Sequence, residues 1–157
     1  MRSLWPDREG SALVEATIII PVLLILVFGV FEFSALFWQE QLISAGVRDA
    51  ARYLARNADP SSRAIENAAE NLAVTGSISG GTPRVPGWSV GDVTVDFASI
   101  DNPIGANGRG AYRGPAVIQV VTVATAYTHR SLGFLDYLGL PNLIIRSSHS
   151  ERVTGPS

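Results

Sequence analysis

Two carboxylates border the most apolar stretch of the chain. Glu15 precedes the uncharged run Ala16–Phe31, and Glu32 follows it. A carboxylate inside a bilayer costs roughly 2.5–3.5 kcal/mol even on the most lenient insertion scales, so it requires a partner. Glu15 is therefore either an interfacial residue beside a membrane anchor or one half of a specific polar contact. Glu32 either lies at the outer interface, where it costs little, or is buried against a partner.

Few other residues could support catalysis or metal binding. The chain has no cysteine, which excludes disulfides, thiolate ligands and a cysteine nucleophile. The two histidines, His129 and His149, are expected near the ends of different strands with no evident third ligand. Asp92 and Asp96 would share the solvent face of one strand. An enzyme would need these groups to converge in a cleft, so we predict no catalytic residue, no metal and no cofactor.

The charge balance also limits the partners. The sequence has 12 basic residues, all of them arginine, against 14 acidic ones, for a net charge of −2. A protein that binds nucleic acid usually presents a strongly basic face. We therefore expect no nucleic-acid partner.

The segment Ala16–Trp38 has the length and composition of a transmembrane helix. It has 23 residues, of which only Glu32 is charged, and as a helix it would span roughly 34 Å, about the thickness of a bilayer core. It shows no polar stripe of the kind that a soluble helix carries. A cleaved signal peptide would require small residues at its cleavage site, but aromatic residues crowd "FEFSALFWQ". We predict that the segment is retained.

The helical pattern extends beyond the membrane segment. It starts at about Ser11, contains Pro21, which is expected to bend the helix, and continues through "FWQEQLISAGVRDAARYLAR" to Arg56. Asn57–Pro60 is a plausible end, because proline disfavours a helical conformation in the residue before it. Three arginines four residues apart form a solvated stripe on this helix: Arg48, Arg52 and Arg56.

The rest of the chain predicts one more helix and a small sheet. A helix is expected from Ser61 or Ser62 to about Val74, followed by a loop rich in glycine, proline and serine. Three strands are expected to pair antiparallel and to pack on one or both helices, which makes the fold α+β: "DVTVDFA", "AVIQVVTVATAYTH" and "LIIRSSHSERV". The apolar loop "LGFLDYLGL" between the last two strands either folds back over the core or forms an exposed contact patch.

The residues around Gly10 resemble a known processing site. "G-S-A-L-V-E" is similar to the cleavage site of type IV-like prepilins. Three further features resemble the TadE-like pseudopilins of tight-adherence pilus systems. They are the apolar segment "SALVEATIIIPVLLILVFGVFEFS", the amphipathic stretch "VRDAARYLAR" and the final strand–"LGL"–strand pattern. The resemblance implies that a prepilin peptidase cuts between Gly10 and Ser11 and leaves Glu15 as the fifth residue of the mature chain. Many members of the family carry an aromatic residue after this glutamate, where the chain has Ala16.

Cleavage would give Glu15 a defined partner. It creates a new α-ammonium on Ser11, which can pair with Glu15 of the same or an adjacent subunit once helices bundle. Any other alignment of the helices would leave these charges unpaired in an apolar bundle, which is unfavourable. The pair would therefore set the register of neighbouring helices. Glu32 is a possible further subunit contact.

The resemblance implies a structural role without enzymatic activity. The expected parts are a leader (1–10), a long helix (11–57) with its transmembrane part at 16–38, and an extracytoplasmic α+β domain (58–157). We expect a minor pilin or pseudopilin that crosses the inner membrane once with its N-terminus in the cytoplasm. Its expected partners are the lipid bilayer, the prepilin peptidase, other pilin subunits and the pilus assembly machinery. The alternative is an uncleaved, single-pass, membrane-anchored binding module of the cell envelope.

Overall fold

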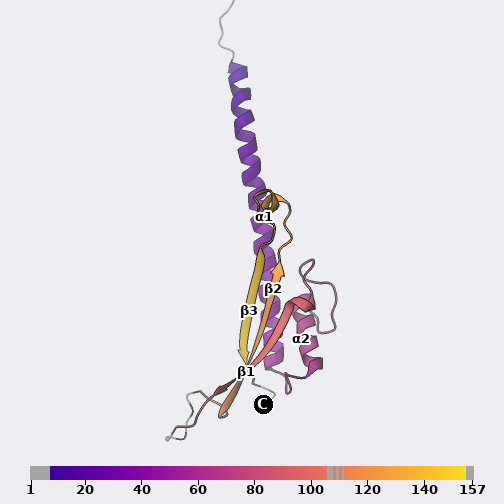
Figure 1. Ribbon diagram of the computed structural model, residues 1–157, viewed down its shortest axis with the longest axis vertical. Coiled ribbons are helices and arrows are strands. Elements are labelled where there is room, and N and C mark those ends of the chain that lie inside the picture. Colours follow the sequence, from indigo (N-terminus) through magenta and orange to yellow (C-terminus); the bar gives the residue numbers. More distant parts are fainter. Residues whose placement is uncertain (1–7, 106–107, 109, 111, 155–157) are drawn as a thin grey trace, which may run out of the picture. The chain divides into compact units, whose positions relative to one another are not determined.

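The computed structural model describes residues 8–105, 108, 110 and 112–154 of the chain. It confirms the predicted α+β fold (Figure 1). A long helix is followed by a short one and then by three strands. In chain order the elements are α1 (Arg8–Ala55), α2 (Arg63–Thr75), the 3-10 helix η1 (Val90–Asp92), β1 (Val93–Asp101), β2 (Val117–Thr128), α3 (Phe134–Tyr137) and β3 (Ile144–Arg152).

The chain forms two compact units. The first contains the part of α1 up to Leu36 together with Arg130–Pro141, and the second contains Phe37–His129 and the chain from Asn142 onward. The predicted division at residues 10 and 57 concerns processing and topology, and it stays a prediction.

In the first unit, α1 is helical from Arg8, about three residues earlier than the sequence pattern predicted, and it continues through Pro21. Residues 1–7 of the expected leader lie outside the described residues. The hydroxyls of Thr17 and Ser34 donate to carbonyls one turn earlier, at distances of 2.7 Å and 2.6 Å. These bonds satisfy two polar groups within the helix itself, as an apolar solvent requires.

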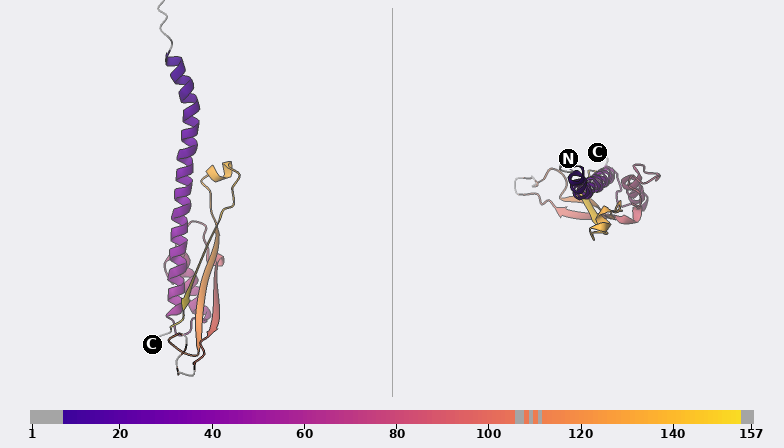
Figure 2. Two further views of the ribbon diagram at one scale, coloured as in Figure 1. Left: turned by 90° about the vertical axis from the view of Figure 1, so that its left-hand side faces the viewer. Right: turned by 90° about the horizontal axis from the view of Figure 1, so that it is seen from above.

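The second unit contains the three-stranded antiparallel sheet that the sequence predicted, and its strands lie in the order β1-β2-β3. Val93 of β1 pairs with Thr125 of β2, and Val123 of β2 pairs with His149 of β3. Figure 2 shows the strands running alongside the part of α1 that belongs to this unit. In this unit the core combines one face of the end of α1, one face of α2 and the inward residues of β2. Its fully buried members include Ile43, Val47, Leu54, Ala69, Ala73, Val121 and Val123.

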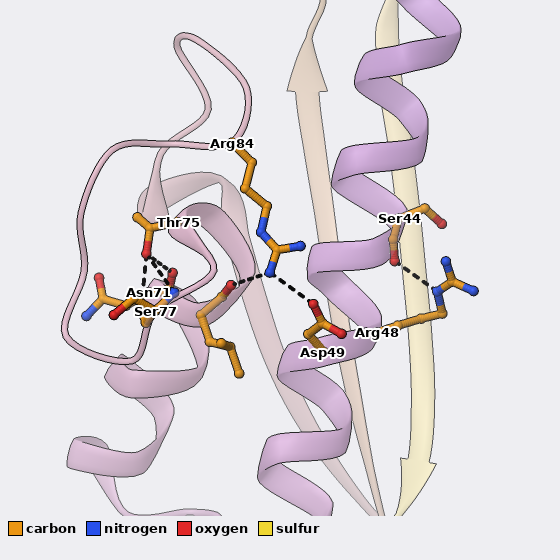
Figure 3. Close-up of polar contacts among 8 residues, drawn as sticks. Ser44, Arg48, Asp49, Asn71, Thr75, Ser77 and Arg84 are labelled. Atoms are coloured by element: carbon orange, nitrogen blue, oxygen red, sulfur yellow. Dashed lines mark hydrogen bonds and ion pairs between the residues drawn. The ribbon is translucent and has the colours of Figure 1, made fainter.

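The glycine-rich segment between α2 and β1 is held against this core. Arg84 donates to the Asp49 carboxylate of α1 at 2.9 Å and to the Leu72 carbonyl of α2 at 3.4 Å (Figure 3). Trp88 is 1% exposed, and its indole N–H donates to the Thr125 hydroxyl at 3.1 Å. A segment that looks like a free loop in sequence is therefore fixed to both helices and to the sheet.

Two local details differ from the sequence expectation. Asp92 is not part of the strand pattern shared with Asp96. It ends η1, and its carboxylate accepts from the backbone N–H and hydroxyl of Ser89 at 2.9 Å and 2.8 Å, closing a capping box. The second difference is α3, one helical turn within a segment expected to be loop.

Candidate membrane anchor and assembly surface

The N-terminal part of α1 presents a continuous apolar surface. Among the described residues, one helical stretch, Gly10–Ala55, is long and apolar enough to cross a membrane, and its most apolar window has a mean hydropathy of 2.7 with no part buried. Leucine, isoleucine, valine and phenylalanine side chains from Leu13 to Phe33 are exposed around the helix. Exposure of such a surface to water is unfavourable, whereas lipid or the helices of other subunits can cover it.

The residues of the expected processing site lie at the start of this surface. Gly10 and Ser11 are exposed, and both belong to the helix. Glu15 is also exposed, one turn after Ser11, and makes no hydrogen bond or ion pair with any residue that the structure describes. A Cβ built on Gly10 meets no atom within 4 Å. The structure thus places these three residues on one open helical segment, where processing and pairing both remain predictions.

Glu32 lies in a different environment, since it is buried by its own chain. Its side chain is 1% exposed, and its carboxylate oxygens accept the backbone N–H of Leu132 at 2.8 Å and 3.0 Å. Leu132 belongs to the segment Arg130–Pro141, which packs with α1 in the first unit. The sequence pattern allowed a partner for Glu32 but did not indicate this segment. A role of Glu32 in subunit contact stays a prediction.

A groove of about 520 Å³ lies next to Glu32, between α1 and this segment. Phe134 is close enough to α1 that a Cβ on Gly29 would lie 3.3 Å from its ring. Apart from Glu32, the groove is lined mainly by apolar residues: Pro21, Leu24, Ile25, Phe28, Leu132, Gly133, Phe134 and Tyr137. The periodicity of the sequence does not show that these two parts of the chain are in contact. The unusual apolar content of the loop, however, indicated a contact surface.

The residues considered for catalysis are not brought together. His149 pairs with Val123 in the sheet, whereas His129 follows the end of β2, six positions further along. Six strand positions correspond to roughly 20 Å. Asp96 is exposed on β1, while Asp92 caps η1. Within the described part of the chain, no group of three or more histidines and carboxylates is arranged to hold a metal ion.

Each histidine has a neighbour in the second unit. His129 Nδ1 lies 2.7 Å from Gln39 Oε1. His149 Nε2 donates to Glu151 Oε1 at 3.0 Å, and Arg52 of α1 lies 3.5 Å from the same carboxylate. The hydrogen bond from His149 is the main cause that lowers the pKa of Glu151, and the charges of His149 and Arg52 add to it. The His129 contact connects the end of β2 to α1, and the Arg52–Glu151 contact connects β3 to α1. Neither contact needs a ligand to explain it.

The comparisons with known proteins agree with the N-terminal pattern. The family model described as "TadE-like protein" matches residues 10–52. No curated protein and no solved structure shows significant similarity to the chain. The match begins at Gly10, covers Glu15 and Glu32, and ends near the end of α1. It fits, together with the apolar helix, a membrane-anchored, pilus-associated protein. Residues 10–52 are thus similar to the TadE-like family, in the part of the chain where the sequence around Gly10 indicated this resemblance.

Proposed function

We propose that the protein is a TadE-like minor pilin or pseudopilin, a membrane-anchored structural component in the assembly of a tight-adherence pilus. The observation that carries the proposal is the order of features on α1. A glycine, a glutamate five positions later and an exposed apolar helix follow one another within the segment that matches the family. The family is a structural, pilin-type family, so we infer that the protein is a substrate of a peptidase and not an enzyme.

The chemistry of the proposed function begins at Gly10. Cleavage of the Gly10–Ser11 bond by a prepilin peptidase would leave an α-ammonium group on Ser11. Glu15 is exposed one turn further along α1. Its carboxylate is available to form an ion pair with the Ser11 ammonium group of the same or a neighbouring subunit. In lipid, pairing removes much of the cost of each charge, so subunits would associate in the one alignment that brings the two groups together.

The proposed location is the inner membrane. The helix crosses once, with the N-terminus in the cytoplasm and the α+β unit outside. The leader contains two arginines, Arg2 and Arg8, whereas the next arginine is Arg48. Basic residues close to the span are retained in the cytoplasm, which supports this orientation. Partners in this setting are other pilin subunits and the assembly machinery.

The mature N-terminus is the test. Mass spectrometry of a C-terminally tagged chain, purified from membranes of its native host, is expected to give a protein that starts at Ser11. The matched control is Gly10→Phe, which should remain uncleaved because a bulky side chain replaces glycine at the cleaved bond. A wild-type chain that starts at Met1 or Arg2 would contradict the proposal and favour an uncleaved anchored binding module. A start beyond Ala35 would mean that the helix is a signal peptide.

A further inference from the structure

We propose that the segment Arg130–Pro141, here called the collar loop, is a second membrane-binding element that inserts into the outer interface of the bilayer beside α1. The inference rests on the proposed function in one respect, that α1 crosses a membrane. The collar loop and the N-terminal part of α1 form one compact unit. Any membrane that surrounds this part of α1 must therefore also meet the loop.

The exposed side chains of the collar loop suit lipid. Leu132 is 70% exposed, Tyr137 78%, and Leu138 and Leu140 50% each. Four large apolar or amphipathic side chains exposed within nine residues are unfavourable in water. Their surface continues the exposed apolar surface of α1, and the groove between them is itself mainly apolar. Lipid that covers this part of α1 therefore also covers the exposed side chains of the collar loop.

Backbone N–H groups of the collar loop donate hydrogen bonds within the protein, as contact with an apolar solvent requires. The N–H of Leu132 donates to Glu32, and the N–H of Gly133 donates to the Ser131 hydroxyl at 2.9 Å. From Tyr137 to Leu140, every N–H donates to a carbonyl of the same loop at 2.8–3.1 Å. Gly139 has a φ of 76°, a conformation that favours glycine, and this allows the chain to close the turn. Backbone donors satisfied internally are a requirement for a loop that contacts lipid.

The charges of the loop define its depth. Arg130 and Asp136 are both exposed, and neither belongs in the hydrocarbon core. At the headgroup level Arg130 can bind lipid phosphates, and a tyrosine such as Tyr137 has its preferred place there. The loop therefore lies at the interface and not at the bilayer centre.

This placement also fixes the outer end of the membrane span. Because the loop is joined to α1 at Gly29 and Glu32, the interface lies near those residues and not at Trp38. The 21 residues from Ser11 to Phe31 span about 32 Å as a helix, which matches the roughly 30 Å of a bilayer core. Glu32, held by the loop at the boundary, is then shielded from lipid by protein.

Spin labelling tests the inference, and the absence of native cysteines makes single-cysteine variants straightforward. Leu138→Cys, with Leu140→Cys as a second position, is labelled in the full chain in vesicles of phosphatidylethanolamine and phosphatidylglycerol. Collision rates are measured with oxygen, which enters lipid, and with a nickel chelate, which stays in water. Leu23→Cys serves as the lipid control and Ser99→Cys as the water control, since both side chains are exposed.

We expect the ratio of oxygen to nickel collisions at Leu138 and Leu140 to shift from the Ser99 value toward the Leu23 value. If Leu23 reports lipid while both loop positions match Ser99, the collar loop is in water, and the inference fails while the anchor stands. If the loop labels are shielded from both reagents and show spin–spin broadening, a second copy covers them, which also overturns the inference. If Leu23 itself reports water, the membrane anchor and the proposed function fail.

Discussion

The Glu32 carboxylate accepts the backbone N–H of Leu132, 100 residues further along the chain. A hydrogen bond to a charged group contributes about 1.5–3 kcal/mol, and a poorly hydrated environment strengthens it. This contact holds the collar loop on α1. It also explains how a glutamate can end an apolar helix segment without facing lipid.

Glu32→Ala is expected to loosen the collar loop. Loss of about 1.5–3 kcal/mol would raise the amide exchange rate of Leu132 by roughly tenfold to a hundredfold, because each 1.36 kcal/mol corresponds to a factor of ten. Hydrogen exchange of the full chain in lipid nanodiscs measures this. Glu32→Gln keeps one side-chain acceptor and should show a smaller increase. Equal exchange in the wild type and in Glu32→Ala would contradict the role of this bond.

Glu15→Ala tests the proposed pairing with the Ser11 amine. The variant removes a charge from the membrane segment, so insertion and processing should proceed, whereas assembly should fail for lack of the register contact. Immunoblots of membrane and sheared-pilus fractions separate these steps. The control is Glu40→Gln, an exposed glutamate on the same helix beyond the apolar run, which should assemble normally. Normal pilus incorporation of Glu15→Ala would exclude the pairing.

Gly46→Ala is expected to destabilise the second unit. A Cβ at this position would overlap the carbonyl oxygen of Ala73 in α2 and lie 3.0 Å from Cη2 of Trp88. Overpacking of this kind costs about 1–3 kcal/mol, against a gain of about 1 kcal/mol in helix propensity. Because the overlap involves backbone, we expect a net loss of about 1–2 kcal/mol and a midpoint of thermal unfolding lower by at least about 4 °C.

The control for this substitution is Gly91→Ala. Its Cβ would meet only the Ser89 hydroxyl, at an ordinary contact distance of 3.7 Å. Circular dichroism during heating should show a change within about 0.5 kcal/mol for this variant. Similar midpoints for both variants would show that α1 and α2 do not approach closely at Gly46.

The helices and strands could be predicted from sequence because each carries its own periodicity. The predicted second helix ended at about Val74 and the observed one ends at Thr75. The strand beginning near Asp92 was found from alternating valines, although Asp92 itself caps η1. The spacing of Ser89 and Asp92 is that of a capping box and could have revealed this local difference.

The environment of Glu32 could not be predicted in the same way. Its carboxylate accepts the backbone N–H of Leu132, a group that every residue except proline carries. The residue type of Leu132 therefore gives no sign of this contact in the sequence. The apolar content of the collar loop indicated a contact, but the choice between the core and another surface depends on tertiary structure. Glu15 differs, because the role predicted for it depends on its spacing from Gly10, which can be read from the sequence.

The pKa of Glu151 predicts a specific acid response of the second unit. The hydrogen bond from His149, with the nearby charge of Arg52, lowers this pKa in the folded protein. A lowered pKa stabilises the fold above the unfolded pKa, and that stability is lost as the pH falls through the folded pKa. Thermal midpoints of the wild type should therefore exceed those of Glu151→Gln at neutral pH and converge with them in acid. A difference that does not change with pH would assign the effect to packing.

Thr125→Val tests how the loop after α2 is held on the sheet. The Thr125 hydroxyl accepts the indole N–H of Trp88 at 3.1 Å and donates to the Asp92 carbonyl at 2.7 Å. Valine keeps the shape but leaves two groups without these partners, at a cost of about 1–3 kcal/mol. Thr94→Val is the control, because its exposed hydroxyl bonds the Ala124 carbonyl at 3.3 Å, where water can replace it. Urea unfolding followed by circular dichroism should show a lower midpoint for Thr125→Val only; equal midpoints in both variants would mean that Trp88 is held by burial alone.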